Sequence, residues 1–304
     1  MDSIKAFYNK NKDKKVIRFI DNFIHRVIDH QILPKGGQLA YFIVLSIFPF
    51  IIALLNILNF TPLADTKIIS DSIQYLPKAT QNIVLSFLGE ISVSSSAKLL
   101  SLSLLGGLWS ASSGIRQTIK AINSAFRSKE TRSFITLSIL ALTFTVALII
   151  LIILLLLTQV FGSKILYLLA TTFHISPEII ELLRKLNIFI PLVYTVFTFA
   201  SLYRFSPNVP KKELKWKFTL PGALFATFGI IISSRIFTFY VNNFGKYSVT
   251  YGSLTGVILL FLWLYLMSII ILIGGEINGI IYQMSGGDGA DVETESFFDG
   301  IFSK

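Results

Sequence analysis

The sequence predicts an all-α fold: a polytopic membrane helical bundle with six transmembrane helices plus short interfacial amphipathic helices. Of the 304 residues, 53% are hydrophobic and only 14% are charged, and the mean hydropathy is +0.69. Soluble chains carry roughly 25% charged residues, so this chain has too little polar surface to coat two soluble domains. Its uncharged runs can cross about 30 Å of hydrocarbon, and they lack β-barrel alternation. A soluble protein is therefore excluded.

Six apolar runs, with charges only near their margins, form a membrane domain that is expected over residues 36–284. Backbone amides in lipid must be hydrogen-bonded within their own segment, so each run is expected to be a helix. The spans are expected at about 38–60, 99–116, 134–161, 186–204, 218–241 and 253–276. The third rises roughly 40 Å, so it must tilt or protrude.

Two segments flank the membrane domain. Residues 1–35 are expected to carry a cytoplasmic amphipathic helix, and residues 285–304 form an acidic tail whose composition predicts disorder. The apolar side of the N-terminal helix is expected to lie either on lipid, with its Lys and Arg residues drawn to anionic headgroups, or on the protein's own cytoplasmic face. A further short helix is expected from Ser176, which is placed to cap it, to Lys185.

The distribution of basic residues predicts the orientation. Lys and Arg number 19 on the side that carries both termini and 8 on the other, so the termini are expected to be cytoplasmic. The net charge of +10 is then explained mostly by the basic residues that set the membrane orientation, and no nucleic-acid partner is expected.

The sequence offers no catalytic, cofactor-binding or metal-binding residues. Cysteine is absent, and the histidines His25, His30 and His174 show no paired metal-ligand spacing. No P-loop occurs, so ATP hydrolysis is not expected. Charges lie at the margins of the spans, which disfavours proton coupling. We expect no enzyme activity and no cofactor.

Four polar or aromatic residues are candidates for the bundle interior. Asn56 is expected to hydrogen-bond between helices, with a substrate role as the alternative. Trp263 is expected near the midplane, where its indole N–H needs a partner. Trp109 and Tyr251 complete this set.

Small residues recur at helical spacing in spans two and six, where another backbone could approach closely. With Ser103 they are Gly106, Ser110, Gly114, Gly252, Gly256, Gly275 and Gly279.

The inner ends of spans two and six bring Arg116 and Glu276 to the same depth. We expect them to form an ion pair, or to share a polar cluster with Asn278 and Asn123, as a cytoplasmic gate or latch. The alternative is that Arg116 reaches a lipid phosphate while Glu276 caps a loop. Lys120 is the next candidate partner.

Several ordered motifs resemble the BrkB/YihY family of bacterial inner-membrane proteins. They are Leu39-Ala40-Tyr41-Phe42, Trp109-Ser110-Ala111-Ser112, Leu220-Pro221-Gly222-Ala223, Tyr247-Ser248-Val249-Thr250-Tyr251-Gly252-Ser253 and Gly274-Gly275-Glu276-Ile277-Asn278. Gly275 stands where the family commonly has alanine. The resemblance implies a six-span plasma-membrane protein linked to envelope integrity or lipid handling.

Three functions follow as expectations. The first is a transporter or flippase-like handler of a lipid or other cell-envelope component. The alternative is a non-transporting scaffold or accessory subunit of an envelope enzyme, with a homo-oligomer or an envelope protein as partner. The third, a ribonuclease, is disfavoured because the sequence offers no histidine–aspartate metal cluster.

Overall fold

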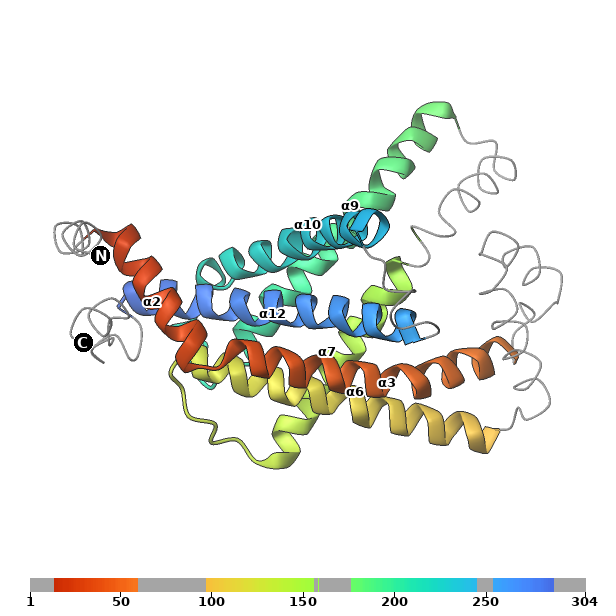
Figure 1. The fold of residues 1–304 in the computed structure, drawn as a ribbon, viewed down its shortest axis with the longest axis horizontal. Coiled ribbons are helices and arrows are strands. Elements are labelled where there is room, and N and C mark those ends of the chain that lie inside the picture. Colours follow the sequence, from red (N-terminus) through yellow and green to blue (C-terminus); the bar gives the residue numbers. More distant parts are fainter. Residues whose placement is uncertain (1–13, 60–96, 156–157, 159–175, 245–253, 287–304) are drawn as a thin grey trace. The chain divides into compact units, whose positions relative to one another are not determined.

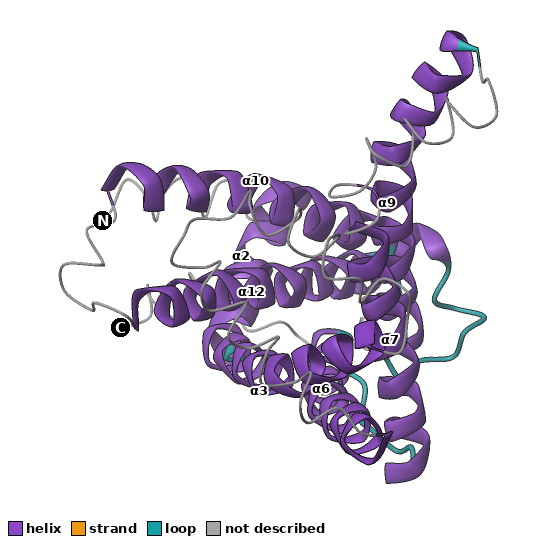
Figure 2. Cartoon of the chain, turned by 90° about the vertical axis from the view of Figure 1, so that its right-hand side faces the viewer, coloured by secondary structure: helices purple, strands orange, loops and turns teal. Residues whose placement is uncertain are grey.

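The computed structural model describes residues 14–59, 97–155, 158, 176–244 and 254–286. These residues are almost entirely helical and contain no strand (Figure 2). The elements are α2 (Lys15–Asp29), α3 (Ile32–Asn59), α6 (Ala97–Ala125), α7 (Phe134–Leu155), α9 (Pro177–Phe205), the 3₁₀ helix η3 (Trp216–Phe218), α10 (Leu220–Phe244) and α12 (Thr255–Met284). The all-α helical class expected from the sequence is confirmed.

Three of these helices are long and apolar enough to cross a membrane. They are α7, α10 up to Val241, and α12. Residues Ile32–Ile47 of α3 and Phe189–Phe205 of α9 are apolar but shorter. The count of six spans stays a prediction.

Helices run beyond several predicted span limits. α6 continues past Arg116 to Ala125, and α12 continues past Glu276 to Met284. Hydropathy marks where lipid ends, whereas a helix ends where its backbone hydrogen bonds end, so the two limits need not agree. The short helix expected after Ser176 is the first part of α9, which continues without a break and has Pro191 inside it.

The chain divides into two compact units, one made of residues 1–40 and 115–304 and the other of Tyr41–Gly114. The second contains the later part of α3 and the earlier part of α6. Every contact described below lies within the first unit. In it α12 packs along α10, and α2 crosses the last turns of α12 (Figure 1).

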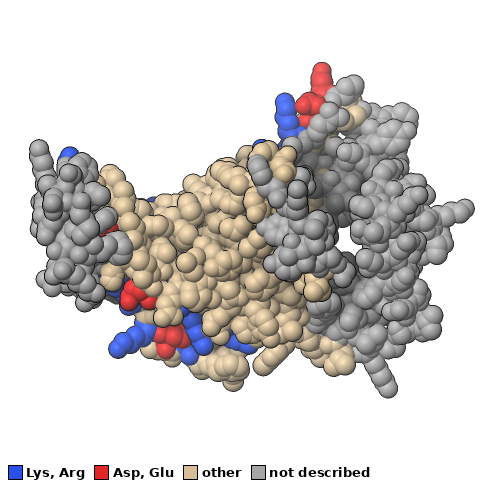
Figure 3. All heavy atoms as spheres, viewed as in Figure 1, with Lys and Arg blue, Asp and Glu red and all other residues tan. Residues whose placement is uncertain are grey.

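The core of the first unit gathers where α6, α9, α10 and α12 converge. Its largest fully buried side chains include Tyr203, Tyr282 and Phe126. On the face shown in Figure 3, a broad area of the described surface carries no charged side chain. This uncharged area suits helices whose middle portions lie in hydrocarbon.

Candidate functional site

Asn278 joins α12 to the start of α10. Its side-chain oxygen accepts a hydrogen bond from the Gly222 amide at 2.7 Å, and its side-chain nitrogen donates to the Thr219 carbonyl at 2.9 Å. The first amides of a helix have no partner within the helix, so the buried Asn278 supplies one from a neighbouring helix. A Cβ at Gly222 would lie under 3.0 Å from the Gly274 carbonyl and from Asn278. Only glycine therefore fits at this position.

The small-residue faces expected in spans two and six differ in what they do. A Cβ at Gly279 would lie under 3.0 Å from the backbone of Ala125, so α12 and the last turns of α6 meet there. A Cβ at Gly275 would meet Ile122 at 3.4 Å, an ordinary contact. Alanine would thus fit at Gly275. At Gly106 and Gly256 a Cβ would meet nothing within 4 Å in the described part of the chain.

Glu276 lies in a buried polar cluster with residues of and after α2. Its Oε1 is 2.7 Å from Nδ1 of His30, and the carboxylate is fully buried. Arg26 is also buried and donates to the Ala125 carbonyl at 3.0 Å and to Oε1 of Gln283. Burial lowers the pKa of the Arg26 guanidinium to about 10, an effect that the negative charge of Glu276 opposes. Arg26 is therefore charged at neutral pH and ties α2 to both α6 and α12.

The four residues of the expected latch have separate surroundings. Glu276 meets His30, and Asn278 meets the start of α10. The Arg116 guanidinium lies 5.6 Å from the centre of the Phe134 ring. Asn123 belongs to a loop cluster described next. No spacing or motif in the sequence links His30 to Glu276, which lies 246 residues away along the chain.

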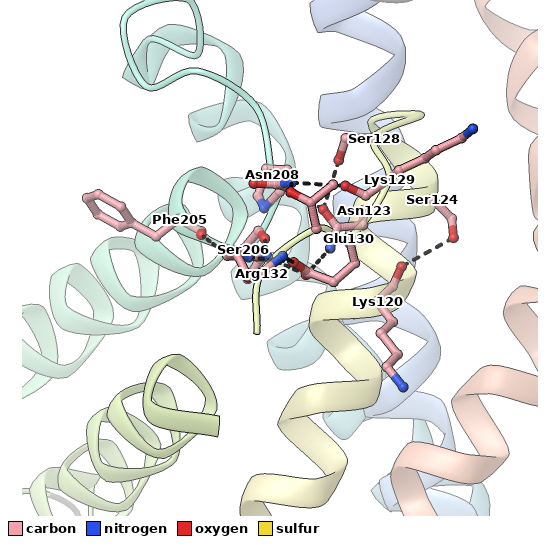
Figure 4. Close-up of polar contacts among 12 residues, drawn as sticks. Lys120, Asn123, Ser124, Ser128, Lys129, Glu130, Arg132, Phe205, Ser206 and Asn208 are labelled. Carbon is pink, nitrogen blue, oxygen red and sulfur yellow. Dashed lines mark hydrogen bonds and ion pairs between the residues drawn. The ribbon is translucent and has the colours of Figure 1, made fainter. Parts of the chain in front are cut away.

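That loop cluster joins the α6–α7 connection to the α9–α10 connection (Figure 4). Oδ1 of the buried Asn123 accepts from the Asn208 amide at 2.7 Å and from the Ser128 hydroxyl at 2.8 Å, while its amide donates to Glu130 at 2.7 Å. Arg132 donates hydrogen bonds to both carboxylate oxygens of Glu130, at 2.7 and 2.6 Å, and also to the Ser206 carbonyl. These hydrogen bonds hold the two loops together and leave the cluster's polar groups engaged with one another.

The remaining interior candidates fall in different places. Trp263 donates its indole N–H to the Ser234 hydroxyl of α10 at 3.2 Å, the partner that its expected depth requires. Trp109, in the second unit, is 61% exposed. Ser110 and Gly114 are buried.

Four further candidates lie outside what the structure describes. They are Tyr251, Gly252 and the side chains of Asn56 and Ser103.

The amphipathic helix α2 packs with its polar side inward. Asp21, Asn22 and Arg26 are buried, whereas Val16 and Ile28 are 68% and 59% exposed. α2 contacts the protein's own helices, as one of the two expectations held, through these polar groups and through Val27, which packs beside Ala121 and Leu272. On its apolar side Val16, Ile20 and Ile28 are exposed, which is the arrangement that lipid contact needs.

An apolar groove runs between α9 and α10 toward the end at which the 3₁₀ helix η3 joins them. Its volume is about 470 Å³. Its lining residues are Leu192, Val193, Val196, Phe197, Ala200, Trp216, Leu220, Leu224 and Phe228. The groove is open outward, since Phe197 and Phe228 are 60% and 48% exposed. Sequence patterns could not reveal it, because each of its residues reads as an ordinary lipid-facing or core position.

Two cations lie near this end of the groove, Arg204 beside Trp216 and Lys211 beside the Phe205 ring. The Arg204 guanidinium is 5.0 Å from the Trp216 ring centre and donates to the Leu214 carbonyl. The Lys211 ammonium donates to the carbonyls of Arg204 and Pro207 at 3.1 and 3.0 Å. Burial, and then repulsion by Arg132 and Arg204, lowers the pKa of Lys211 to about 8. Among the described residues, no carboxylate forms an ion pair with Arg204 or Lys211.

A second cavity of about 490 Å³ lies on the other side of η3. Three lysines, Lys212, Lys215 and Lys217, line it together with Glu213, which accepts a hydrogen bond from Tyr282 at 3.1 Å. Within the described residues, no group of three or more His, Asp or Glu side chains could hold a metal ion.

Comparison with known proteins identifies the family of this chain. The family model described as Virulence factor BrkB matches residues 23–295. The chain belongs to the BrkB family. The family resemblance of the sequence motifs is thereby confirmed. Two of these motifs, around Gly222 and around Gly274 to Asn278, meet at the α10–α12 contact.

Individual relatives agree with this assignment. The chain is 34% identical to the putative ribonuclease-like protein YfkH of Bacillus subtilis, over 87% of this chain and 95% of that protein. It is 28% identical to a UPF0761 membrane protein of Alteromonas mediterranea, over 91% of each chain. A UPF0761 membrane protein of Chlorobium chlorochromatii is 27% identical over 86% of this chain and 59% of that protein. No solved structure matches. This BrkB-family chain is a membrane protein.

Proposed function

We propose that this BrkB-family protein is a transporter or flippase-like handler of a lipid or other amphipathic component of the cell envelope. The observation that carries the proposal is the groove between α9 and α10. From Leu220 to Phe228 it rises about 12 Å, close to one leaflet of a bilayer whose core is about 30 Å thick. Its lining is apolar and open outward, so it suits a molecule that enters sideways from lipid.

The proposal is tested with the purified full-length protein in liposomes that contain a trace of fluorescent phospholipid. Externally added dithionite bleaches only the outer leaflet, so transport exposes more than half of the fluorescence. Val196→Trp is expected to fill the groove and to abolish this additional bleaching. Ile236→Trp, at an exposed site of α10 outside the groove lining, is the matched control. Equal bleaching in protein-containing and protein-free liposomes, for phospholipids and for glycolipid precursors, would contradict the proposal.

The outward apolar side of α2 supports a second element of this function. We propose that α2 lies in the cytoplasmic interface, where the exposed Lys14, Lys15 and Arg18 attract anionic lipids. Because the chain has no cysteine, single spin labels can be placed without removing native residues. A label at Ile20→Cys or Ile28→Cys is expected to be reached by oxygen rather than by a water-soluble nickel complex. Asp29→Cys is the exposed polar control, and equal nickel access at all three sites would contradict the interfacial position.

We also propose that both termini lie in the cytoplasm and that the protein lies in the bacterial inner membrane. This assignment follows the excess of Lys and Arg on one side. Two reporters are fused at Gly286, one that is active only in the cytoplasm and one that is active only in the periplasm. Activity of the cytoplasmic reporter would support the assignment, and activity of the periplasmic reporter would contradict it. We also propose that the chain is not an enzyme, so the purified protein should leave RNA uncut with several divalent metals.

One observation favours the scaffold alternative. Only 11% of the most apolar window of α10 is buried within the described chain, so much of this helix could meet another protein or a second copy. Cross-linking in membranes from cysteines placed along α10 separates the two functions. A single recovered partner with no lipid movement would favour the scaffold.

A further inference from the structure

We propose that the groove between α9 and α10 binds one phospholipid, with an acyl chain along the groove and the phosphate on Arg204 and Lys211. This inference names the substrate class for the proposed lipid-handling function and rests on it. We name a membrane phospholipid rather than free phosphate as the occupant, because Trp216 lines the apolar groove and also contacts Arg204.

The geometry places an apolar surface and a cationic surface on the same ring. Trp216 lines the groove and stacks on Phe197, with ring centres 5.9 Å apart. The Arg204 guanidinium lies 5.0 Å from the same ring. A molecule that fills the groove up to Trp216 therefore meets a cation directly beyond its apolar part. A phospholipid has this order of groups, since its acyl chains are followed by a phosphate.

Both cations keep hydrogen-bond donors for that phosphate. The guanidinium has five N–H groups, of which the described contacts to the carbonyls of Leu214 and Lys211 use two. The Lys211 ammonium has three N–H groups, of which two donate to carbonyls. These carbonyl contacts hold the two side chains in place, and pre-positioned donors lose less conformational entropy when a ligand binds.

The charge balance favours an anion at this place. Arg204 and Lys211 lie near each other and near Arg132, and the carboxylate in this region, Glu130, is held by Arg132. Repulsion among like charges in a partly buried place is relieved by an anion, and a phosphate carries both the charge and the acceptor oxygens. The lysines of the second cavity, by contrast, share their surroundings with Glu213.

The test measures lipid retention rather than transport. Full-length protein is purified in mild detergent, and bound lipid is counted by native mass spectrometry after addition of phosphatidylglycerol, phosphatidylcholine or diacylglycerol with the same acyl chains. The wild type is expected to retain one phospholipid and to retain diacylglycerol about tenfold less, since only the phosphate forms charge-assisted hydrogen bonds.

Three variants locate the two ends of the lipid. Lys211→Gln together with Arg204→Gln is expected to lower phosphatidylglycerol retention about tenfold and to leave diacylglycerol unchanged. Val196→Trp is expected to lower retention of all three lipids. Lys212→Gln with Lys215→Gln removes the same charge from the second cavity and is expected to change nothing. Thermal unfolding of each variant checks that it folds, and Lys211→Arg is expected to retain the wild-type preference if the double variant is unstable.

Each result has a defined meaning. Equal retention of phospholipid and diacylglycerol, or equal loss from the Lys212 and Lys215 control, would overturn the phosphate site. Inorganic phosphate that binds without displacing phospholipid would place the anion elsewhere and would also overturn it. The liposome assay reports separately on transport, so lipid movement without selective retention would remove this inference and leave the proposed function standing.

Discussion

The carboxylate of Glu276 in α12 is fully buried and lies 2.7 Å from the imidazole of His30, which directly follows α2. Arg26, one turn earlier, is buried beside the same helix and reaches Gln283. Two charged residues and a histidine therefore fasten α2 to the last turns of α12. A buried charge is costly unless it has partners, so each member of this cluster depends on the others.

Removing the carboxylate should destabilise the protein. Glu276→Ala leaves Arg26 charged in a buried place without the negative charge of Glu276, and we expect a loss of about 3 kcal/mol in unfolding free energy. Glu276→Gln keeps an acceptor for His30 and should cost less. The melting temperature in detergent measures both. Asp29→Ala removes an exposed carboxylate 3.9 Å from the same histidine and is the control. A Glu276→Ala protein as stable as this control would contradict the role of the cluster.

Charge exchange separates His30 from Arg116 as the partner of Glu276. The sequence predicts a pair with Arg116, whereas the structure places His30 against the carboxylate. We therefore expect that Arg116→Glu combined with Glu276→Arg is no more stable than Glu276→Arg alone. Recovery of part of the stability in the double variant would instead support the Arg116 pair. Expression and melting temperature of the three variants decide between them.

Two glycines should resist substitution while two others tolerate it. Gly222→Ala and Gly279→Ala place a methyl group against a neighbouring backbone, and we expect losses of about 1–3 kcal/mol from overpacking. Gly106→Ala and Gly256→Ala meet open space among the described residues and should be neutral, or more stable by about 0.5–1 kcal/mol, since glycine weakens helices. Thermal unfolding compares the four. Equal effects would show that helix propensity, not packing, decides these positions.

Sequence reasoning found the helical class, the family and most helices, because hydropathy and helix-capping patterns are local. It also found that Trp263 needs a partner, although not that Ser234 supplies it. Small-residue spacing pointed equally to Gly279, which contacts Ala125, and to Gly256, which contacts nothing described. Spacing shows which residues share a face but not what that face meets.

The candidate site was beyond sequence reasoning for a related physical reason. The groove is made by the relative position of α9 and α10. The cations near it, Arg204 in the last turn of α9 and Lys211 in the loop that follows, belong to a segment whose charge had been explained by topology. The inward polar side of α2 was equally hidden. Amphipathicity locates two faces, and only the neighbours Ala125 and Gln283 show which one is buried.

The loop cluster should lose stability in acid. The hydrogen bonds from Arg132 hold the pKa of the Glu130 carboxyl below its ordinary value. The stabilisation from this carboxylate is therefore present above the ordinary pKa and is lost as the pH falls through the lowered one. Glu130→Gln should melt below the wild type at pH 7, and the difference should shrink toward pH 4. A difference that stays constant with pH would show that charge is not involved.

Phospholipid retention should fall in mild alkali, because the pKa of Lys211 is lowered to about 8 by burial and by the nearby guanidinium groups of Arg132 and Arg204. Lys211 is charged below this value and neutral above it, so its attraction for a phosphate is lost as the pH rises. A bound phosphate favours the charged form, which moves the transition above 8 in the lipid complex.

We expect phosphatidylglycerol retention to fall about three- to tenfold between pH 7 and 9.5. Lys211→Arg should keep retention constant over this range, because arginine stays protonated throughout. Lys211→Gln should be weak at both pH values, and Lys212→Arg, in the second cavity, should keep the wild-type pH profile. If retention by Lys211→Arg still falls between pH 7 and 9.5 as it does in the wild type, another group titrates, and Lys211 is removed from the phosphate site.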